Sequence, residues 1–392
     1  MKTASTHKEG KMKRILSILI GVCLALNLAG VAGAASGGIK IGVISSQTGW
    51  DAANGSYINN GIKMAVEEIN QAGGIDGKKI ELIFEDDQGS TEVAVNGLTK
   101  ILSAHPDVNA LLLPVLSTMV LAMEQKVAEM KVPALFGATN VKITQLGNPW
   151  LFRVRPSDAI SAAASPIFAV KDLKAKTIGV LHSNEAFGTG GAEIVVKTLK
   201  EKFEITPVAT LSHNKDDKEF TAQLMTFKSK NVDTILTWDL ATPSGFIAKQ
   251  IRQLGLKVNV VGSPAWIIPD VLELAGSAAN GTYAVNDGIP WDDRHPDKKV
   301  AAAAQKYMKI AKGYSNFGGA YYDAVYLLAN AMKTAHSTDR DKIRQALLAT
   351  KGFAGVANEY SFSKVGEGVS TAAIVKVKDG RPDFVLKVTP TP

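Results

Sequence analysis

The 392-residue sequence contains a single cysteine, Cys23, which lies in an apolar stretch near the N-terminus. With one cysteine the chain cannot form an internal disulfide, and without that stretch it has no thiol at all. Beyond this stretch, no run of the sequence reaches the roughly 18 uninterrupted apolar residues of a membrane-spanning helix. These absences exclude a disulfide-stabilised scaffold, and they predict a soluble chain.

Signatures of common enzymes and cofactor sites are also missing. No phosphate-binding P-loop, no HExxH metal motif and no GxSxG nucleophile motif occurs. Phe187–Gly191 contains Gly-x-Gly, but Glu193 occupies the position at which a dinucleotide-binding motif needs a third glycine. Adjacent carboxylates such as Asp86-Asp87 project in different directions, so we interpret them as caps and turns, not as acid–base pairs. We therefore expect no catalysis, no cofactor and no metal.

Positive charge is modest. The chain has 44 Lys and Arg residues against 37 Asp and Glu, a net charge of +7. Five of the basic and one of the acidic residues lie within positions 1–34, which leaves +3 for the rest. So small a charge gives no basis for nucleic-acid binding. Charged residues make up 21% of the chain and hydrophobic residues 46%, a balance typical of globular proteins and not of disordered ones.

The N-terminal stretch predicts export. Lys13-Arg14 precede an apolar run, Ile15–Leu28, and Ala32-Gly33-Ala34 then supplies small residues. This order is typical of a secretory signal peptide, with cleavage after Ala34. We therefore expect residues 1–34 to be removed and the mature chain to be periplasmic.

Three alternatives bear on this segment. Met12 would be a more usual start, so residues 1–11 could be an upstream extension. A membrane anchor is disfavoured because the apolar run is short and Asn27 interrupts it. Lipoprotein anchoring through Cys23 would need a small residue before it, and Val22 stands there.

Short β-branched runs alternate with amphipathic segments along most of the chain. Predicted strands cover 39–45, 79–84, 108–113, 132–136, 177–181, 206–211, 232–238 and 258–262. Helices are predicted between them, including 158–170, and a helical block at 298–349 precedes strands near 360–362, 372–377 and 384–388. This alternation predicts an α/β fold with parallel sheets that helices cover on both faces. The extended segment 152–156 separates two such series.

Aromatic side chains follow several predicted strands. Parallel sheets of this kind bind ligands at the carboxyl ends of their strands. Trp50, Phe187 and Trp266 lie in such loops, and Trp238 ends a strand beside one. These rings either contact a ligand or pack the loops, and the residues alone leave both possibilities open.

Two polar segments lie at the same strand ends. Ser117 begins a helix directly after the strand 108–113, where free N–H groups and a hydroxyl suit a carboxylate. Otherwise Ser117 only caps that helix. Ala138-Thr139-Asn140 follow the next strand and offer backbone N–H groups and a second hydroxyl, or form an ordinary loop.

Several stretches together resemble periplasmic substrate-binding proteins of the branched-chain amino-acid ABC transporter type. The resemblance covers nearly the whole chain after residue 34, and its stretches are IKIGVISSQTGWDAANG, GIKMAVEEINQAGGIDGKKIELIFEDDQ, KVPALFGATNVKIT, IGVLHSNEAFGTGG, FIAKQIRQLGLKVNVVG and YYDAVYLLANAM. It implies a type I periplasmic-binding-protein fold, in which two Rossmann-like lobes with parallel central sheets are joined by a three-segment hinge. Lobe 1 would comprise 35–155 and 286–362, and lobe 2 would comprise 156–285 and 363–388.

The resemblance also implies a ligand site between the lobes. The carboxylate-binding loops of the family match Leu116-Ser117 and Gly137-Ala138-Thr139. An aromatic residue of lobe 2 matches Phe187, and another aromatic contact matches Phe317.

Two departures from the family pattern concern the ligand. Leu116 replaces the first residue of a Ser-Ser pair, and Pro264 stands where an acidic residue receives the ligand's ammonium. A buried ammonium without a carboxylate costs several kcal/mol, although Asp239 at another strand end could substitute. The ligand is then either a branched-chain or other apolar amino acid, or an aromatic or aliphatic carboxylic acid that lacks the α-amino group.

We therefore expect the extracytoplasmic solute-binding component of an ABC importer. Its lobes would close on a small carboxylate and then dock on the membrane permease subunits. We expect a monomer. A sensory ectodomain would use the same fold, a secreted hydrolase would need a nucleophile–base pair, and a repressor with similar lobes would need an N-terminal DNA-binding helix pair.

Overall fold

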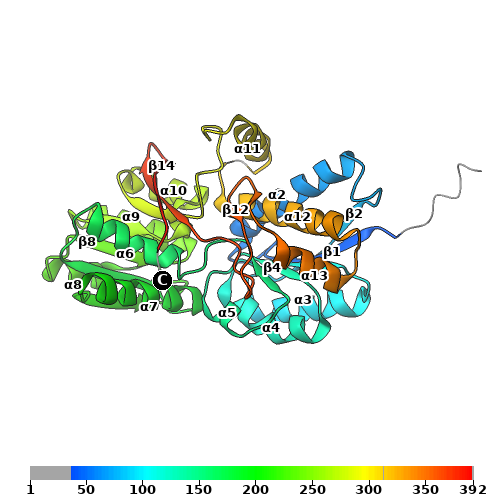
Figure 1. Ribbon diagram of the computed structural model, residues 1–392. Helices are drawn as coiled ribbons and strands as arrows, with labels where there is room; N and C mark the ends of the chain where they lie inside the picture. The colour runs from blue at the N-terminus through cyan, green and yellow to red at the C-terminus, as the bar shows by residue number, and fades with distance from the viewer. Residues whose placement is uncertain (1–36, 312, 391–392) are drawn as a thin grey trace, which may run out of the picture. The chain divides into compact units, whose positions relative to one another are not determined.

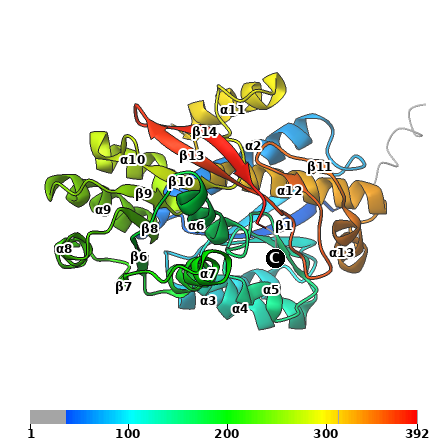
Figure 2. The ribbon, with the colours of Figure 1, turned by 60° about the vertical axis from the view of Figure 1, so that its left-hand side comes forward.

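The computed structural model describes residues 37–311 and 313–390. The predicted signal peptide and Cys23 therefore lie outside the described residues. From Ile39 onward the chain forms one compact unit, which Figures 1 and 2 show from two sides. Within the described ranges, no helix combines the length and the apolar character that crossing a membrane requires.

The first sheet has five parallel strands in the order β2-β1-β3-β4-β5. Their bounds are β1 Ile39–Ser45, β2 Ile80–Asp86, β3 Ala110–Leu113, β4 Ala134–Phe136 and β5 Leu151–Arg153. The central strand β3 has the sequence ALLL and is fully buried. Such an uninterrupted apolar run is what a parallel strand needs when helices cover both of its faces.

The helices of this part come from both ends of the chain. They are α2 Ala52–Gln71, α3 Thr91–Ala104, α4 Ser117–Met130, α5 Lys142–Gln145, α11 Lys298–Ala311, α12 Asn316–Ala335 and α13 Arg340–Ala349. Helix α12 lies alongside α2 (Figure 1), and the Tyr322 hydroxyl donates to Glu68, 254 positions away. A short hairpin, β11 Phe353–Ala354 with β12 Glu359–Tyr360, follows. We call the five-stranded sheet, these helices and this hairpin the first lobe.

The second sheet has seven strands in the order β14-β13-β10-β9-β8-β6-β7. Their bounds are β6 Ile178–Ser183, β7 Ala209–His213, β8 Thr234–Trp238, β9 Asn259–Gly262, β10 Tyr283–Asn286, β13 Ala372–Lys378 and β14 Arg381–Val388. Strands β6 to β10 pair in parallel, whereas β13 pairs antiparallel with both β10 and β14. Figure 2 shows the red β13–β14 hairpin beside β10 and α6.

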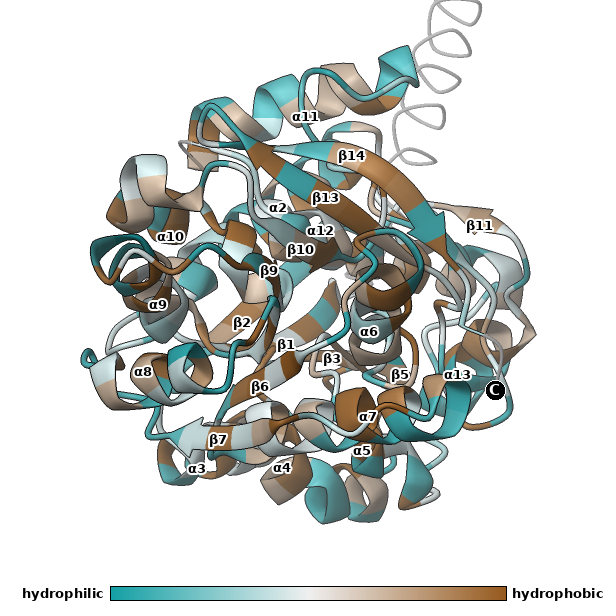
Figure 3. Cartoon of the chain, turned by 90° about the vertical axis from the view of Figure 1, so that its left-hand side faces the viewer, coloured by the Kyte–Doolittle hydropathy of each residue, from teal (hydrophilic) through white to brown (hydrophobic). Residues whose placement is uncertain are grey.

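The helices of this second lobe are α6 Ser161–Lys171, α7 Ala186–Phe203, α8 Thr221–Ser229, α9 Ala241–Gln253 and α10 Pro269–Ala275, with 3-10 turns at Pro264–Ile267 and Gly276–Ala279. In Figure 3 the strands β6, β9 and β10 are mostly brown, whereas helix α11 carries teal residues on its visible surface. The predicted α/β fold with parallel sheets under helices is confirmed. Several details differ: α5, β5, β10, α10 and β11 were not predicted as helices or strands, and α6 begins at Ser161 and not at residue 158.

Three segments connect the lobes, and buried arginines hold them together. Arg153, at the end of β5, donates from Nε to both Glu367 oxygens at 3.1 and 3.0 Å. Arg155 donates from Nε and Nη2 to the Asp287 carboxylate at 2.6 and 3.0 Å. Because Asp287 follows β10 and Glu367 precedes β13, two neighbouring arginines tie the first connecting segment to the second and the third.

Candidate functional site

Two adjoining cavities lie where the two lobes meet. The first, which we call the apolar compartment, measures about 30 Å³. It is lined by Asn54, Val115, Leu116, Arg155, Phe187, Leu240, Ala241, Pro264, Ala265 and Phe317. Several of these residues directly follow β3, β8 and β9, so the cavity lies at the carboxyl ends of parallel strands, where such sheets bind ligands.

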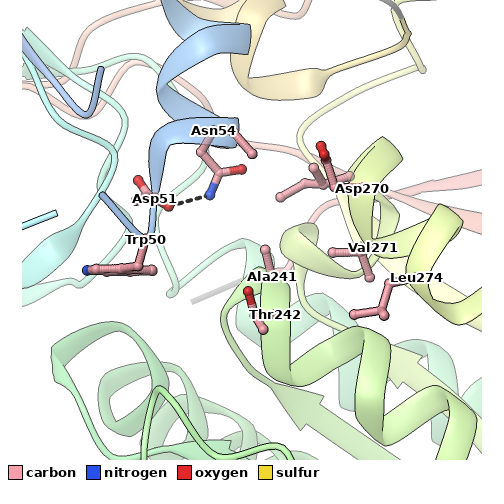
Figure 4. A pocket seen from close by; sticks show the side chains of 10 residues that line it. Trp50, Asp51, Asn54, Ala241, Thr242, Asp270, Val271 and Leu274 are labelled. Atoms are coloured by element: carbon pink, nitrogen blue, oxygen red, sulfur yellow. Dashed lines mark hydrogen bonds between the residues drawn. The ribbon is translucent and has the colours of Figure 1, made fainter. Parts of the chain in front are cut away.

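The second cavity, which we call the polar compartment, measures about 110 Å³ and is shown in Figure 4. It is lined by Trp50, Asp51, Ala53, Asn54, Ala241, Thr242, Ile268, Asp270, Val271 and Leu274. Asn54 of the first lobe and Ala241 of the second lobe line both compartments, so the two cavities adjoin.

The lobes also contact each other around these cavities. The Tyr57 hydroxyl donates to the Asp270 carboxylate at 2.9 Å. The Asn140 side-chain amide donates to the Ala186 carbonyl at 2.6 Å. The two lobes are therefore in direct contact beside the cavities.

Three of the predicted aromatic contacts line the cavities. Phe187 and Phe317 line the apolar compartment, where the Arg155 guanidinium lies 4.3 Å from the centre of the Phe317 ring. Trp50 lines the polar compartment and is 38% exposed, with its indole N–H donating to the Gly89 carbonyl at 2.8 Å. Phe187, Phe317 and Trp50 are thus placed where a ligand could reach them.

The other two predicted platforms lie in the core of the second lobe. Trp238 is completely buried, and a Cβ atom at Gly191 would come within 1.9 Å of its ring. Trp266 is also buried, and its indole N–H donates to the Thr282 hydroxyl at 2.9 Å. Neither ring lines either compartment, and both are buried, which favours packing over ligand contact among the two possibilities that the sequence left open. Trp238 reaches the site only indirectly, through a ring contact with Phe187 at 5.7 Å.

The predicted carboxylate loops come together at the end of the first sheet. Leu116 is the N-cap of α4 and lines the apolar compartment, so Ser117 is the first helical residue and not the cap. The Ser117 hydroxyl accepts a hydrogen bond from the Asn140 N–H at 3.3 Å. Ser117 and Thr139 are both buried, and the Thr139 hydroxyl has no hydrogen-bond partner among the described residues.

Backbone groups of the same loop are partly occupied. The Gly137 N–H donates to the Tyr321 hydroxyl at 3.0 Å, and its carbonyl accepts from Arg155 at 2.9 Å. The Ala138 carbonyl accepts from Arg153. Gly137 and Ala138 therefore position the loop, while Ser117 and Thr139 carry its side-chain hydroxyls.

Asp239 does not reach the cavities. Asp239 is completely buried, and one of its carboxyl oxygens lies 2.6 Å from His213 Nε2. The backbone carbonyl of Asp239 accepts a hydrogen bond from the Ser263 hydroxyl. Burial raises the pKa of the Asp239 carboxyl. Burial is the largest single effect on the His213 imidazole and lowers its pKa, but the hydrogen bond and charge of Asp239, together with the Asn214 carbonyl and the Asp217 charge, raise the pKa overall. Asp239 thus forms an internal pair with His213, and its replacement of the missing acid at Pro264 stays a prediction.

Asp158 is an acidic residue at the lobe junction that the sequence reasoning missed. Its N–H donates to the Thr139 carbonyl at 2.8 Å, and neither of its buried carboxyl oxygens has a hydrogen-bond partner among the described residues. Burial raises the pKa of this carboxyl to about 7, although the nearby Thr139 hydroxyl and the charges of Arg153 and Arg155 act in the opposite direction. The available sequence signal is an acid two residues after the extended segment 152–156, where the pattern also predicts the start of a helix.

Arg155 is a second residue at the lobe junction that the sequence analysis does not identify as part of the site. It lines the apolar compartment, and its pairing with Asp287 leaves the guanidinium beside Phe317. Among the described residues, no group of three His, Cys, Asp or Glu side chains is arranged to hold a metal ion.

Comparison with known proteins shows to which family this chain belongs. The sequence model described as periplasmic binding protein matches residues 38–382. The chain belongs to the periplasmic binding protein family. It is 28% identical over 372 residues to Leu/Ile/Val-binding protein homolog 3 of Brucella melitensis, an alignment that covers 93% of this chain and 98% of that protein.

Solved structures agree with this assignment. The leucine-binding protein LivK of Thermotoga maritima superposes with a TM-score of 0.82 at 26% identity, covering 90% of this chain and 99% of that one. LivJ of Streptococcus pneumoniae, a branched-chain amino acid transporter substrate-binding protein in complex with isoleucine, gives a TM-score of 0.79 at 27% identity. That match covers 90% of this chain and all of the other, 100%. The resemblance seen in the sequence and the type I fold that it implied are confirmed.

Proposed function

We propose that this protein is the extracytoplasmic solute-binding component of an ABC importer and binds a small carboxylate-bearing ligand between its lobes. The observation that carries the proposal is the apolar compartment, because residues of both lobes line it at the ends of β3, β8 and β9. The names of the Brucella, Thermotoga and Streptococcus relatives support the same role. The relatives are binding proteins and not enzymes, so we also propose that the chain has no catalytic activity.

The carboxylate end of the ligand is assigned to the first lobe. Helix α4 begins at Ser117, and the N–H groups of a helix start favour a negative charge. The unpartnered Thr139 hydroxyl supplies a further donor. We propose that these groups bind the carboxylate.

The unpartnered carboxyl of Asp158 favours an amino acid as the ligand. Pro264 lines the apolar compartment where the resemblance implied an acid, and Asp239 is engaged with His213. Asp158 is buried beside Thr139 without a partner, so an ammonium group would offset the cost of burying its charge. We propose a branched-chain or other apolar amino acid as the ligand. A carboxylic acid without the α-amino group is the second candidate, and Pro264 favours it.

Closure around the ligand would drive transport. The ligand contacts both lobes only when they are closed, so it shifts the equilibrium by its extra affinity for that state. The closed pair would then dock on the permease subunits. Three further statements remain predictions: the monomeric state, the export signal, and the lobe boundaries 35–155 with 286–362 and 156–285 with 363–388. If the export signal is cleaved as predicted, N-terminal sequencing of the secreted protein should begin at Ala35.

A paired ligand panel tests the proposal. Leucine, isoleucine and valine are each compared with the matching 2-oxo acid by calorimetry on the mature chain. We expect the amino acids to bind, and Asp158→Asn to weaken them much more than the 2-oxo acids. Asp239→Asn is the matched control, because it removes an equally buried carboxyl that is already paired with His213. Better binding of the 2-oxo acids with Asp158→Asn harmless would instead favour the second candidate.

Small-angle scattering on the same samples tests closure. A ligand that binds by calorimetry should reduce the radius of gyration when the free protein is open. Absence of binding by every carboxylate in the panel would contradict the proposed function as a whole.

A further inference from the structure

The polar compartment is not needed for an apolar amino acid. It adjoins the apolar compartment through Asn54 and Ala241, and its 110 Å³ offers room for several water-sized groups. Figure 4 shows its walls: Trp50, Asp51 and Asn54 on the side of the first lobe, and Thr242, Asp270, Val271 and Leu274 on the side of the second. Its polar lining atoms are mainly hydrogen-bond acceptors.

Asn54 directs an unused acceptor into this space. Its side chain is only 7% exposed, and its amide nitrogen donates to an Asp51 carboxyl oxygen at 2.7 Å. Since the Asp51 carboxylate can only accept, the Asn54 carbonyl oxygen must point the other way. Figure 4 shows this oxygen on the side of Ala241 and Asp270, and it has no partner among the described residues. A buried acceptor of this kind requires a donor.

The charged side chains that line the polar compartment are both acidic. Asp51 is 4% exposed and lies near Asp87, and burial together with this neighbour raises the pKa of its carboxyl to about 7. Asp270 contributes a second carboxylate from the first turn of α10. No Lys or Arg is among the described residues that line the compartment. Outside the lining, Lys215 Nζ lies 5.0 Å from the centre of the Trp50 ring.

From these observations we propose that the polar compartment is a cation subsite, which binds a protonated amine at the end of the ligand opposite its carboxylate. A donor cation satisfies the Asn54 oxygen and compensates the carboxylates of Asp51 and Asp270 at once. The inference rests on the proposed binding of an amino acid between the lobes, and it extends the ligand class beyond apolar amino acids. The preferred ligand would be an amino acid whose apolar chain passes between Asn54 and Ala241 and ends in a second ammonium group.

The test compares two ligands of the same length. Ornithine and norleucine differ only in that an ammonium group replaces the terminal methyl group. Titration calorimetry on the mature chain should show that ornithine binds at least tenfold more tightly than norleucine. In Asp270→Asn the two affinities should come within about threefold of each other.

Tyr57→Phe is the matched control for this variant. Both Tyr57→Phe and Asp270→Asn disturb the hydrogen bond between the Tyr57 hydroxyl and the Asp270 side chain, but only Tyr57→Phe leaves the Asp270 carboxylate in place. The tenfold ratio should therefore persist in Tyr57→Phe, and Asp51→Asn provides a second variant that should reduce it. Norleucine binding as tightly as ornithine to the unmodified chain, or a ratio that survives both aspartate variants, would overturn the cation subsite and leave the proposed function intact. Failure of both ligands and of the whole amino-acid panel to bind would overturn the proposed function itself.

Discussion

Asp158 allows the cost of a buried carboxylate to be measured directly. Its two carboxyl oxygens have no hydrogen-bond partner among the described residues, and burial raises its pKa from 3.8 to about 7. Asparagine has nearly the same shape but cannot ionise. The variant Asp158→Asn therefore removes the charge while it changes the packing little.

The sign of the effect follows from proton binding. Between pH 4 and pH 7 the folded chain holds a proton on Asp158 that the unfolded chain has released. The free energy of unfolding of the unmodified chain therefore falls as the pH rises through this range. At 1.36 kcal/mol per pKa unit, the difference between 3.8 and about 7 amounts to on the order of 4 kcal/mol above pH 7. Asp51 and Asp323 also have pKa values raised to about 7 by burial, but they remain in both proteins and cancel in the comparison.

Urea unfolding of the ligand-free mature chain, at pH values from 4 to 8, measures this difference. The free energy of unfolding of Asp158→Asn, relative to that of the unmodified chain, should increase by on the order of 4 kcal/mol between pH 4 and pH 8. Asp216→Asn is the control, because that side chain is 72% exposed. A stability difference that stays constant with pH, or that favours the unmodified chain at pH 8, would refute the argument that the cost of burying the Asp158 charge exceeds the compensation from Thr139, Arg153 and Arg155.

Three further changes test the packing, the closure and the connections. Trp266→Ala should lower the free energy of unfolding by about 3–5 kcal/mol, because it empties a core position; a loss of ligand affinity at full stability in urea would show that the ring faces the ligand after all. Tyr57→Phe removes a hydrogen bond to the Asp270 carboxylate worth about 1.5–3 kcal/mol, so calorimetry should show weaker binding of every ligand, and unchanged affinity would mean that this bond does not support closure. Arg155→Met strands the buried Asp287 carboxylate and should cost about 3–5 kcal/mol; Arg155→Met combined with Asp287→Leu should recover part of the loss in thermal unfolding, and no recovery would mean that the pair does not act as a unit.

The fold was predictable because its strands are short and strongly apolar. Runs such as the ALLL of β3 separate cleanly from the amphipathic helices around them, and a resemblance over most of the chain supplied the two-lobe arrangement. The strand β10 was missed since only four residues, Tyr283–Asn286, form it. Its partners β9 and β13 come from distant parts of the chain, so local periodicity carries little of its signal.

The site was predictable in position but not in side-chain direction. Successive residues of a strand point to opposite faces, so an aromatic residue at a strand end can face the cleft or the core. Trp238 fits into the core because Gly191 on α7 leaves room for its ring, a pairing that only the packed structure reveals. Asp158 was missed for a related reason, since its lack of a partner becomes visible only when the lobes are assembled around it.

The packing of α12 against α2 also bears on when the chain can fold during its synthesis. The face of α2 that α12 covers cannot be buried until residues near Tyr322 exist, 254 positions after Glu68. Contacts this distant in sequence slow folding, because the long intervening loop must close first. When the ribosome has completed all strands of the first sheet, the first lobe still lacks helix α12. For the export that we propose for this chain, this delay would keep the nascent polypeptide in an incompletely folded form that can still cross a membrane.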